Sequence, residues 1–322
     1  MKALVTGGGG FIGCHLVRHL LDEGHEVRVL DNFATGRREN LLEILDSIEL
    51  IEGDIQSDER AHTAVRGCEV VFHHAALPSV PRSIQDPLTS NAVNVIGTLN
   101  VLLAARDAEV RRVIFSSSSS TYGASEQLPK REDMPALPIS PYAVGKLAAE
   151  GYCRAFSEVY DLETVCFRYF NVFGPRQDPL SQYAAVIPNF ITSFIRNEPP
   201  TVFGDGEQTR DFTYVDNVVQ ANLLAAEALQ ASGRIYNIAA SERISLNQII
   251  EQLRELTGLD LEPIYVPKRP GDVRHSLADV SRASRELGYV PQVRFEDGLR
   301  RTLEFHRNLP LPSRAERATA QA

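Results

Sequence analysis

Cysteine is scarce in this sequence of 322 residues, and its few copies are scattered. The four thiols belong to Cys14, Cys68, Cys153 and Cys166, and no two of them form a CxxC pair. This spacing lacks the usual signatures of zinc sites and redox-active pairs. Disulfides belong to oxidising compartments. We therefore expect reduced thiols in a cytoplasmic protein.

The chain also lacks an excess of positive charge and a long hydrophobic run. With 33 Lys and Arg against 42 Asp and Glu, its net charge is −9, whereas proteins that hold nucleic acid by its phosphates carry a basic face. No run of about 18 apolar residues is present, so we expect no membrane span. The first apolar run ends after three residues, so no signal peptide is expected. The 21 glycines and 18 prolines are too few for a disordered or fibrous chain.

The first half of the chain alternates strand-like and helix-like segments. Its length predicts about two domains, at about 150 residues each. Alternation of strands and helices predicts a parallel sheet with helices on both faces, a doubly wound fold of the α/β class. Strands are expected at Lys2–Thr6, Glu26–Leu30, Leu50–Glu52, Val70–His73, Arg112–Ser116 and Thr164–Arg168, and helices at Phe11–Glu23, Asn91–Arg106 and Tyr142–Tyr160.

Prolines interrupt this pattern after Asn171, so a smaller domain is expected to start near Gly174. Helices are expected at 183–196, 217–231, 245–257 and 279–287, and Ile235–Ile238 is expected to return to the main sheet. The predicted nucleotide-binding domain covers 1–173, with a strand and a helix returning near 212–257. The predicted second domain covers 174–211 and 258–309, and the tail 310–322 is expected to be disordered.

A glycine-rich turn, GGGGFIG at residues 7–13, follows the first strand and opens the first helix. Such glycines permit a tight turn and close backbone approach to a pyrophosphate at the helix N-terminus. Asp31 ends the second strand, where a carboxylate accepts the ribose hydroxyls of NAD and repels the 2′-phosphate of NADP. Arg37 and Arg38 lie nearby, so NADP remains open at this point. Asp54 and Ile55, after the third strand, are expected to hold the adenine edge.

Tyr142 and Lys146 are four residues apart at a helix start, a spacing that puts both side chains on one helical face. A free tyrosine, with a pKa near ~10, is a poor base at neutral pH, but a nearby ammonium stabilises its phenolate. The serine run at 116–120 ends a strand at the carboxyl edge of the sheet, where ligands bind. A hydroxyl there can hydrogen-bond a substrate oxygen and relay its proton to Tyr142.

Seven motifs occur in order: TGGGGFIG, DN, HHAALPSVPRS, SSSSSTYG, SPYAVGK, RYFNVFG and GDGEQTRDF. Together they resemble the marks of the extended short-chain dehydrogenase/reductases. Within that group the chain resembles the UDP-galactose 4-epimerase family, closest to the bacterial UDP-N-acetylglucosamine 4-epimerases, from residue 1 to about residue 305. The resemblance implies a Rossmann-type sheet with a smaller C-terminal α/β domain for the UDP-sugar, and NAD as the cofactor. It also implies a homodimer paired through Asn91–Arg106 and Tyr142–Tyr160.

Individual roles follow from the same resemblance. It implies that catalysis belongs to Ser118, Tyr142 and Lys146. The cofactor residues expected from the motifs and the resemblance are Gly7, Gly10, Phe11, Ile12, Gly13, Asp31, Asn32, Asp54, Ile55, Ala75, Ala76, Leu77, Asn94, Tyr142, Lys146 and Tyr169. The implied substrate residues are Ser79, Arg82, Ser119, Ser120, Asn171, Arg210, Arg269, Asp272 and Ser276.

The implied reaction is a reversible hydride transfer. Tyr142 removes the proton of the sugar 4-hydroxyl, the C4 hydride moves to NAD+, the 4-keto sugar turns, and the hydride returns to its opposite face. No acid follows Ser118, which disfavours dehydration and decarboxylation. A non-catalytic NAD-binding protein is the least expected alternative, because both Tyr142 and Lys146 are present.

Ser276 bears on the choice of sugar. Relatives restricted to UDP-glucose and UDP-galactose have a tyrosine at the matching position, so a small residue admits UDP-GlcNAc and UDP-GalNAc without rejecting plain hexoses. Arg82 could meet a C6 carboxylate, which keeps UDP-glucuronate open. No metal is expected: His15 and His19 lie four residues apart on the first helix, but no third ligand is evident.

Overall fold

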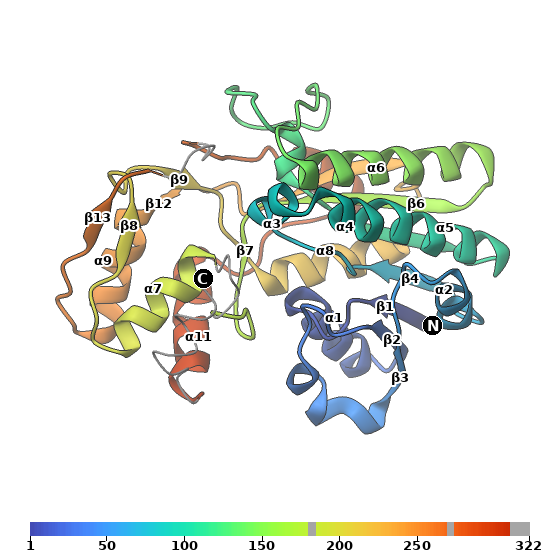
Figure 1. Cartoon of the computed structure of the whole chain (residues 1–322), viewed down its shortest axis with the longest axis horizontal. Coiled ribbons are helices and arrows are strands. Elements are labelled where there is room, and N and C mark those ends of the chain that lie inside the picture. Colours follow the sequence, from blue (N-terminus) through green and yellow to red (C-terminus); the bar gives the residue numbers. More distant parts are fainter. Residues whose placement is uncertain (180–184, 269–273, 310–322) are drawn as a thin grey trace.

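The computed structural model of the chain describes residues 1–179, 185–268 and 274–309. Its larger lobe is built on a seven-stranded sheet in the order β11-β6-β5-β4-β1-β2-β3 (Figure 1). All six pairings in this sheet are parallel. The strands are β1 (Lys2–Thr6), β2 (Glu26–Asp31), β3 (Ile48–Glu52), β4 (Val70–His73), β5 (Arg112–Ser118), β6 (Glu163–Tyr169) and β11 (Arg234–Ile238).

The predicted strands of this sheet are confirmed, including the one that returns from the second half of the chain beside β6. Their cores are nearly continuous apolar runs because both faces of the sheet are covered. β5 and β6 continue one or two residues past the predicted ends, to Ser118 and Tyr169. The predicted α/β doubly wound class is therefore confirmed, and polar residues occupy the last positions of the two strands.

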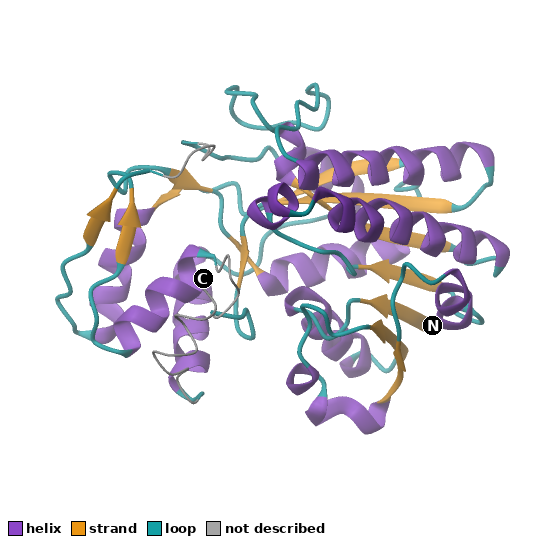
Figure 2. Cartoon of the chain, in the orientation of Figure 1, coloured by secondary structure: helices purple, strands orange, loops and turns teal. Residues whose placement is uncertain are grey.

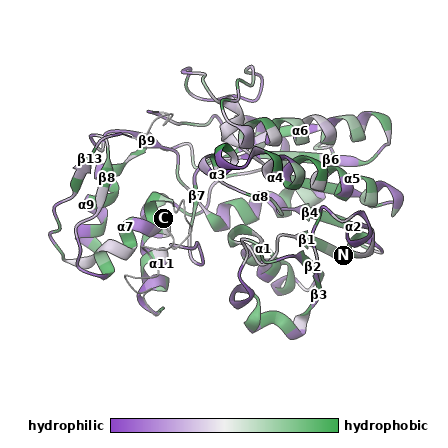
Figure 3. Ribbon diagram, viewed as in Figure 1, coloured by the Kyte–Doolittle hydropathy of each residue, from purple (hydrophilic) through white to green (hydrophobic). Residues whose placement is uncertain are grey.

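Helices cover both faces of the sheet (Figure 2). Apolar residues of α2 (Asp58–Val65), α5 (Thr98–Asp107) and α6 (Pro141–Val159) form one buried cluster with the sheet. Those of α1 (Phe11–Asp22), α8 (Val215–Glu227) and α10 (Ser281–Leu287) form the cluster on the other face. Hydrophobic and hydrophilic stretches alternate along these helices (Figure 3), as expected for helices with one buried face.

The segment 91–106 is not the single regular helix that its pattern predicts. It divides into α4 (Pro87–Asn91), a π-helical turn (Ala92–Gly97) and α5. Asn94 lies in the turn and is 1% exposed. Single π-helical turns inside α-helices are frequent at functional sites. Apolar periodicity cannot reveal such a turn, because the residues on both sides of it keep a helical pattern.

The smaller lobe has its own core (Figure 1). It contains α7 (Val186–Ile195), α9 (Leu246–Thr257), α11 (Phe295–Arg307) and the parallel pair β8 (Thr201–Phe203) and β13 (Ile264–Val266). Two further short pairs are β7 (Val172–Phe173) with β10 (Thr213–Tyr214), where the lobes join, and β9 (Thr209–Arg210) with β12 (Ile244–Ser245), in the smaller lobe near β8 and β13 (Figure 1). The exact domain boundaries remain a prediction.

Several elements were not predicted. The sequence pattern left out α11, although Leu299 and Leu303 bury one face of it. It also left out α3 (Val80–Gln85), the two-residue strands and the 3₁₀ turns Arg38–Asn40, Leu42–Ser47 and Ser119–Tyr122. These elements are too short to show a period. The predicted disorder of the tail falls on residues outside the described part of the chain.

The helical run Pro87–Asp107 is long and apolar enough to cross a membrane by length and composition. Half of its apolar window is buried inside the protein, and it packs against α2 and α6. A core helix passes the same test, so the run is weak evidence for a membrane span. The absence of a membrane span therefore remains a prediction.

Candidate active site

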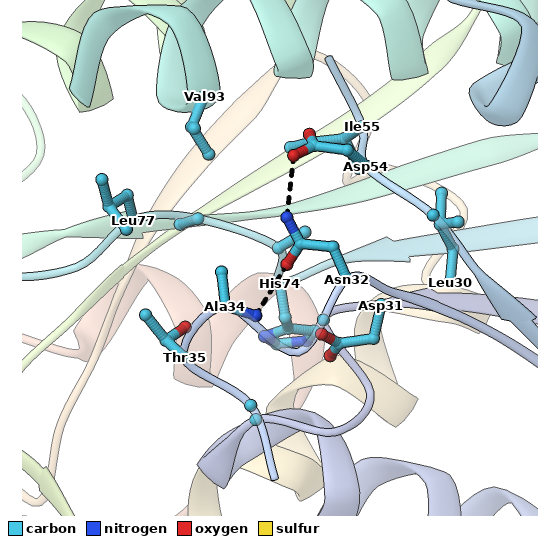
Figure 4. A pocket seen from close by; sticks show the side chains of 16 residues that line it. Leu30, Asp31, Asn32, Ala34, Thr35, Asp54, Ile55, His74, Leu77 and Val93 are labelled. Atoms are coloured by element: carbon cyan, nitrogen blue, oxygen red, sulfur yellow. Dashed lines mark hydrogen bonds between the residues drawn. The ribbon is translucent and has the colours of Figure 1, made fainter. Parts of the chain in front are cut away.

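The site lies at the carboxyl ends of β1 and β4, where the strand order reverses. Chain connections leave the sheet in opposite directions at such a point, which opens a crevice for a ligand. Figure 4 shows the pocket found there. Its lining includes these residues predicted to bind the cofactor: Gly7, Gly10, Asp31, Asn32, Asp54, Ile55, Ala75, Ala76 and Leu77.

The glycine turn packs so closely against neighbouring backbone that side chains do not fit at two of its positions. Gly7 has φ +73°, and a Cβ there would lie 2.6 Å from the Ala75 nitrogen. A Cβ at Gly13 would lie 2.2 Å from the Gly7 oxygen. Gly10 precedes α1, whose first two residues are Phe11 and Ile12, and no side chain caps this helix. This start of α1 fits a pyrophosphate held by backbone N–H groups.

Asp31 is held by backbone groups inside this turn. Its Oδ2 accepts a hydrogen bond from the Gly9 nitrogen at 2.8 Å, and its Oδ1 accepts one from the Phe33 nitrogen at 2.7 Å. Burial raises the pKa of Asp31, and the two N–H donors oppose the shift. Asn32 Nδ2 donates to Asp54 Oδ2 at 2.8 Å (Figure 4). The two carboxylates thus face the pocket from the ends of β2 and β3.

The two nearby arginines are engaged by acidic side chains. Arg38 pairs with Glu52, and its guanidinium lies 4.3 Å from the centre of the Phe33 ring. Arg37 Nη1 lies 3.7 Å from a carboxylate oxygen of Asp178. A 2′-phosphate would have to compete with these acids and with Asp31. The geometry therefore favours NAD over NADP.

The loop after β4 is fixed by Asn94 from the π-helical turn. Asn94 Oδ1 accepts a hydrogen bond from the Leu77 nitrogen at 2.8 Å, and Asn94 Nδ2 donates to the Leu77 oxygen at 3.0 Å. The structure thus brings Asn94 to the loop that holds Ala75 and Ala76. Its amide positions that loop.

β5 and the start of α6 bring the three predicted catalytic residues together. Lys146 is 3% exposed, and its Nζ donates to the Ser116 oxygen at 2.7 Å. The Tyr142 hydroxyl is hydrogen-bonded to the side chain of Ser118. Ser118 Oγ also accepts a hydrogen bond from the Ser120 nitrogen at 3.2 Å. A strand end and a helix start therefore place Ser118, Tyr142 and Lys146 around one point.

The pKa of Tyr142 is raised by burial, and its hydrogen bond with Ser118 opposes the shift. Burial lowers the pKa of Lys146 to about 8. The expected lowering of the Tyr142 pKa by Lys146 is not found. The Lys146 Nζ lies 6.0 Å from the centre of the Tyr142 ring and donates to a carbonyl instead. The protein alone therefore holds the tyrosine in its neutral form.

His73 and His74 lie at the end of β4, and burial is the main reason that the pKa of each falls to about 3. His73 Nδ1 lies 2.7 Å from Thr6 Oγ1. His74 Nδ1 lies 2.5 Å from Ser116 Oγ, and its ring stacks on Tyr169 at 6.2 Å between centroids. Both are neutral wall residues. Among residues 1–179, 185–268 and 274–309, no group of three His, Cys, Asp or Glu side chains could hold a metal ion.

Two predicted substrate residues have backbone conformations that side chains rarely adopt. Ser79 has φ +98° and Asn171 has φ +27°. Residues held this way cluster at ligand sites. Ser79 caps α3, and its Oγ accepts from the nitrogen of Arg82, which is half-buried. Ser119 and Ser120 form the turn after β5, where Ser120 Oγ is buried without a partner among the described residues.

Two of the remaining predicted substrate residues, Arg210 and Ser276, lie in the described part of the smaller lobe. The Ser276 nitrogen donates to the Thr209 oxygen at 3.1 Å, so Ser276 lies beside β9, which carries Arg210. Arg210 Nη1 donates to the Thr209 oxygen at 3.0 Å and to the Arg274 oxygen at 3.2 Å. Arg269 and Asp272 lie outside the described residues.

One ion pair at the site was missed. Glu150 and Arg168 are 2% and 4% exposed, with Arg168 Nη2 2.7 Å from Glu150 Oε2. Glu150 lies one helical turn after Lys146, and Arg168 begins the RYFNVFG motif. A charged residue one helical turn after the predicted catalytic lysine was a signal that the sequence offered for this ion pair.

The fold and the site define a dinucleotide-binding enzyme of the Rossmann type. The family model described as the NAD dependent epimerase/dehydratase family matches residues 3–239. The chain belongs to this family, which confirms the cofactor NAD and the resemblance to the extended short-chain dehydrogenase/reductases.

Relatives with different substrates are similar to the chain over nearly its whole length. UDP-glucose 4-epimerase of Mycolicibacterium smegmatis is 41% identical, over 96% of this chain and 99% of its own. The structure of UDP-N-acetylglucosamine 4-epimerase from Methanobrevibacter ruminantium, in complex with UDP-N-acetylmuramic acid, matches with a TM-score of 0.90 and 39% sequence identity. This match covers 95% of this chain and 97% of that chain. The structure of UDP-glucuronic acid 4-epimerase from Bacillus cereus, in complex with UDP-glucuronic acid and NAD, matches with a TM-score of 0.87 and 32% sequence identity. This match covers 95% of this chain and 98% of that chain.

Proposed function

We propose that this NAD-dependent UDP-sugar 4-epimerase interconverts UDP-GlcNAc and UDP-GalNAc, with UDP-glucose and UDP-galactose as further substrates. The observation that carries the choice of sugar is Ser276, a small side chain beside β9 in the smaller lobe. A hydroxymethyl group leaves room for a 2-acetamido group as the sugar turns. It permits the larger sugar without attracting it, so plain hexoses remain substrates.

The protein's own residues would handle the proton of the sugar. When bound, NAD+ supplies the hydride acceptor and donor. Tyr142, in its phenolate form, would accept the proton of the 4-hydroxyl, and Ser118, hydrogen-bonded to Tyr142, would bridge the two oxygens. Lys146, anchored on the Ser116 oxygen, would place a positive charge that favours this phenolate before it takes the proton. Neutral His73 and His74 and the buried strand ends keep water from this point.

The nucleotide would be held where the lobes meet. Arg210 on β9 and the backbone around Asn171, in the turn between β6 and β7, would hold it, and a guanidinium suits a diphosphate. Ser79, Arg82, Ser119 and Ser120 would border the sugar.

UDP-glucuronate is the second candidate, because Arg82 is half-buried at the first turn of α3 and could pair with a C6 carboxylate. A glucuronate enzyme would convert UDP-glucuronate faster than UDP-GlcNAc and would lose that preference in Arg82→Ala. The N-acetyl enzyme proposed here would show the reverse preference.

A homodimer belongs to the same proposal. Leu88, Ile96, Val144 and Tyr152 are 82%, 46%, 53% and 38% exposed on α4, the π-helical turn and α6. Exposed apolar side chains gathered on neighbouring helices mark an interaction surface. Light scattering should give twice the mass of one chain at micromolar concentration, and the mass of one chain would refute the dimer. A cytoplasmic location remains a prediction.

The experiment is proton NMR of UDP-GlcNAc with purified protein and no added NAD. The expected result is a new UDP-GalNAc anomeric signal. The matched variant is Ser276→Tyr, whose bulk would reduce turnover of UDP-GlcNAc by at least about 10-fold and leave UDP-glucose turnover within about 3-fold of the unaltered protein. Turnover of UDP-glucose alone by the unaltered protein would contradict the proposed substrate.

A further inference from the structure

A buried polar cluster joins the elements that carry the proposed catalytic residues. At its centre is the ion pair of Glu150 on α6 and Arg168 on β6. Arg168 Nε donates to Glu150 Oε1 at 2.9 Å, and Arg168 Nη2 donates to Glu150 Oε2 at 2.7 Å. Both side chains are almost wholly buried. The two parallel bonds fix the relative orientation of the helix and the strand.

The pair also holds the strand that carries Ser118. Ser117 Oγ donates to Glu150 Oε1 at 2.5 Å, and Ser117 is the partner of Arg168 in the β5–β6 register. The neighbours of Ser117 along β5 are Ser116, whose oxygen accepts from Lys146, and Ser118. One carboxylate thus anchors the β5 segment that touches both Lys146 and Tyr142.

A third connection reaches the turn that follows the serine run. The Arg168 guanidinium lies 4.6 Å from the centre of the Tyr122 ring. Tyr122 ends the 3₁₀ turn Ser119–Tyr122, and its hydroxyl donates to Asn237 Oδ1 at 2.6 Å. Asn237 lies on β11, next to β6. The cluster therefore fixes both ends of the Ser118–Tyr122 segment.

We propose that Glu150 and Arg168 are positioning residues that hold Ser118 on β5 against Tyr142 and Lys146 on α6. The proposal rests on the roles proposed above for those three residues. Neither Glu150 nor Arg168 is among the residues that line the cofactor pocket. Both act through Ser117, the β5 backbone and helix α6. Misplacement of a reacting group by about 1 Å can cost about 100-fold in rate, so loosening this anchor should lower kcat.

The pair also places two opposite charges beside the ionisable centre. The titratable groups that face Lys146 are Tyr142, Glu150 and Cys153 on its own helix, His73 and His74 at the end of β4, and Cys166 on β6. Arg168 adds a positive charge next to Glu150. Loss of the negative charge lowers the pKa values of neighbouring groups, and loss of the positive charge raises them. The two single substitutions should therefore shift the pH profile in opposite directions, which a merely structural role would not do.

The experiment compares Glu150→Gln, Arg168→Gln and the double variant with the unaltered protein. Each single substitution should lower kcat by about 10- to 100-fold, with KM within about 3-fold because neither residue is placed at the substrate. Both limbs of the kcat–pH profile should move to lower pH in Glu150→Gln and to higher pH in Arg168→Gln. The double variant has neither charge, so its profile should return toward that of the unaltered protein.

The matched control is Glu163→Gln at the opposite end of the same two strands. Glu163 lies 2.6 Å from Arg112, whose side chain is 1% exposed. This substitution should lower the melting temperature and leave kcat and the pH profile unchanged. If neither single variant folds, the double variant decides, because it carries no unpaired charge.

The proposal would be overturned by folded variants with unaltered kcat, or by single variants whose profiles move in the same direction. A double variant with unaltered kcat would overturn it as well. Tyr142→Phe separates this failure from failure of the proposed function. A fully active Tyr142→Phe would refute the catalytic roles themselves, whereas an inactive one combined with active Glu150 and Arg168 variants would refute only the positioning role.

Discussion

The strands β5 and β6 bury an arginine at each end, and the two ends are built differently. At the amino end, Arg112 faces Glu163 in register, and Glu163 is 37% exposed. At the carboxyl end, Arg168 pairs with Glu150 from a helix, and the carboxylate is 2% exposed. Breaking a buried pair costs far more than breaking an exposed one. At the carboxyl end, both charges of the ion pair are removed from water, which costs desolvation free energy. This pair lies where the proposed reaction depends on the position of the side chains.

Other residues repeat the contrast. Beyond β4 and β5 the carboxyl end carries neutral histidines, serine hydroxyls and a lysine bonded to a carbonyl, and most of these groups have specific hydrogen-bond partners. Polar groups buried this way must be matched by hydrogen bonds, so few substitutions are tolerated. Residues at the amino end connect the sheet to short turns and solvent. The difference indicates that residues along the whole sheet contribute to the stability of the fold, whereas the proposed reaction uses residues at the carboxyl edge only.

The largest expected effect comes from two tyrosines at opposite ends of α6. Tyr142→Phe removes the proposed base and should lower kcat by about 100- to 10,000-fold. Tyr160→Phe removes a hydroxyl from a ring that is 47% exposed at the far end of the helix, and kcat should stay within about 2-fold. Steady-state rates with UDP-GlcNAc measure both. Equal effects of the two substitutions would contradict the assignment of the site to the carboxyl end.

Next in size is a pair of glycines with similar backbone angles. Gly7 has φ +73° and Gly24 has φ +78°, but a Cβ at Gly7 meets the Ala75 backbone while one at Gly24 meets nothing within 4 Å. Gly7→Ala should therefore empty the site of NAD, and Gly24→Ala should cost only about 1 kcal/mol of strain. The ratio of absorbance at 260 and 280 nm of the purified variants reports the bound nucleotide. Full NAD content in folded Gly7→Ala would refute the assignment of this turn.

The smallest effect concerns the pH dependence of stability. Asp211 is fully buried, and burial raises its pKa to about 7, although backbone N–H groups of Ala240 and Ala278 donate to it. An unfolded aspartate has a pKa of about 3.9, so between these values the folded chain holds a proton that the unfolded chain has lost. Stability from this group is therefore present at low pH and declines as pH rises toward 7, by at most about 1.4 kcal/mol per pH unit.

Thermal melts between pH 5 and pH 8 measure this slope. The melting temperature should fall with pH in the unaltered protein, and Asp211→Asn should reduce the fall because its amide does not ionise. A slope that is unchanged in Asp211→Asn would show that other groups produce it.

Much of this organisation was predictable because the first half of the chain keeps a regular alternation. Strands buried on both faces are apolar runs, and the turn after β1 needs glycines for reasons that a sequence shows directly. The spacing of Tyr142 and Lys146 likewise identified the helix start at the site. The π-helical turn at Asn94 was not predictable, because apolar periodicity is the same on both sides of it.

The interaction partners of the site residues could not be predicted from the sequence either. Glu150 and Arg168 are 18 residues apart in the chain, and only the packing of α6 on β6 brings them together. The Tyr142 pKa was expected to fall under the influence of Lys146, but burial raises it and Lys146 donates to a carbonyl. The pKa of a buried group depends on desolvation and on the positions of single atoms. The spacing of residues in the sequence gives no information about either. α11 was predictable, because Leu299 and Leu303 give it one apolar face at helical spacing, and the sequence analysis missed it.

The most direct test of the account is an isotope experiment on the carbon that is proposed to react. UDP-GlcNAc carrying deuterium at C4 should give UDP-GalNAc that retains the deuterium at C4, because the hydride leaves and returns inside a site closed to water. Proton NMR in ordinary water then shows no C4 proton signal in the product. A product with protium at C4 would mean that the hydrogen exchanges with solvent, and it would contradict hydride return at the carboxyl end of the sheet.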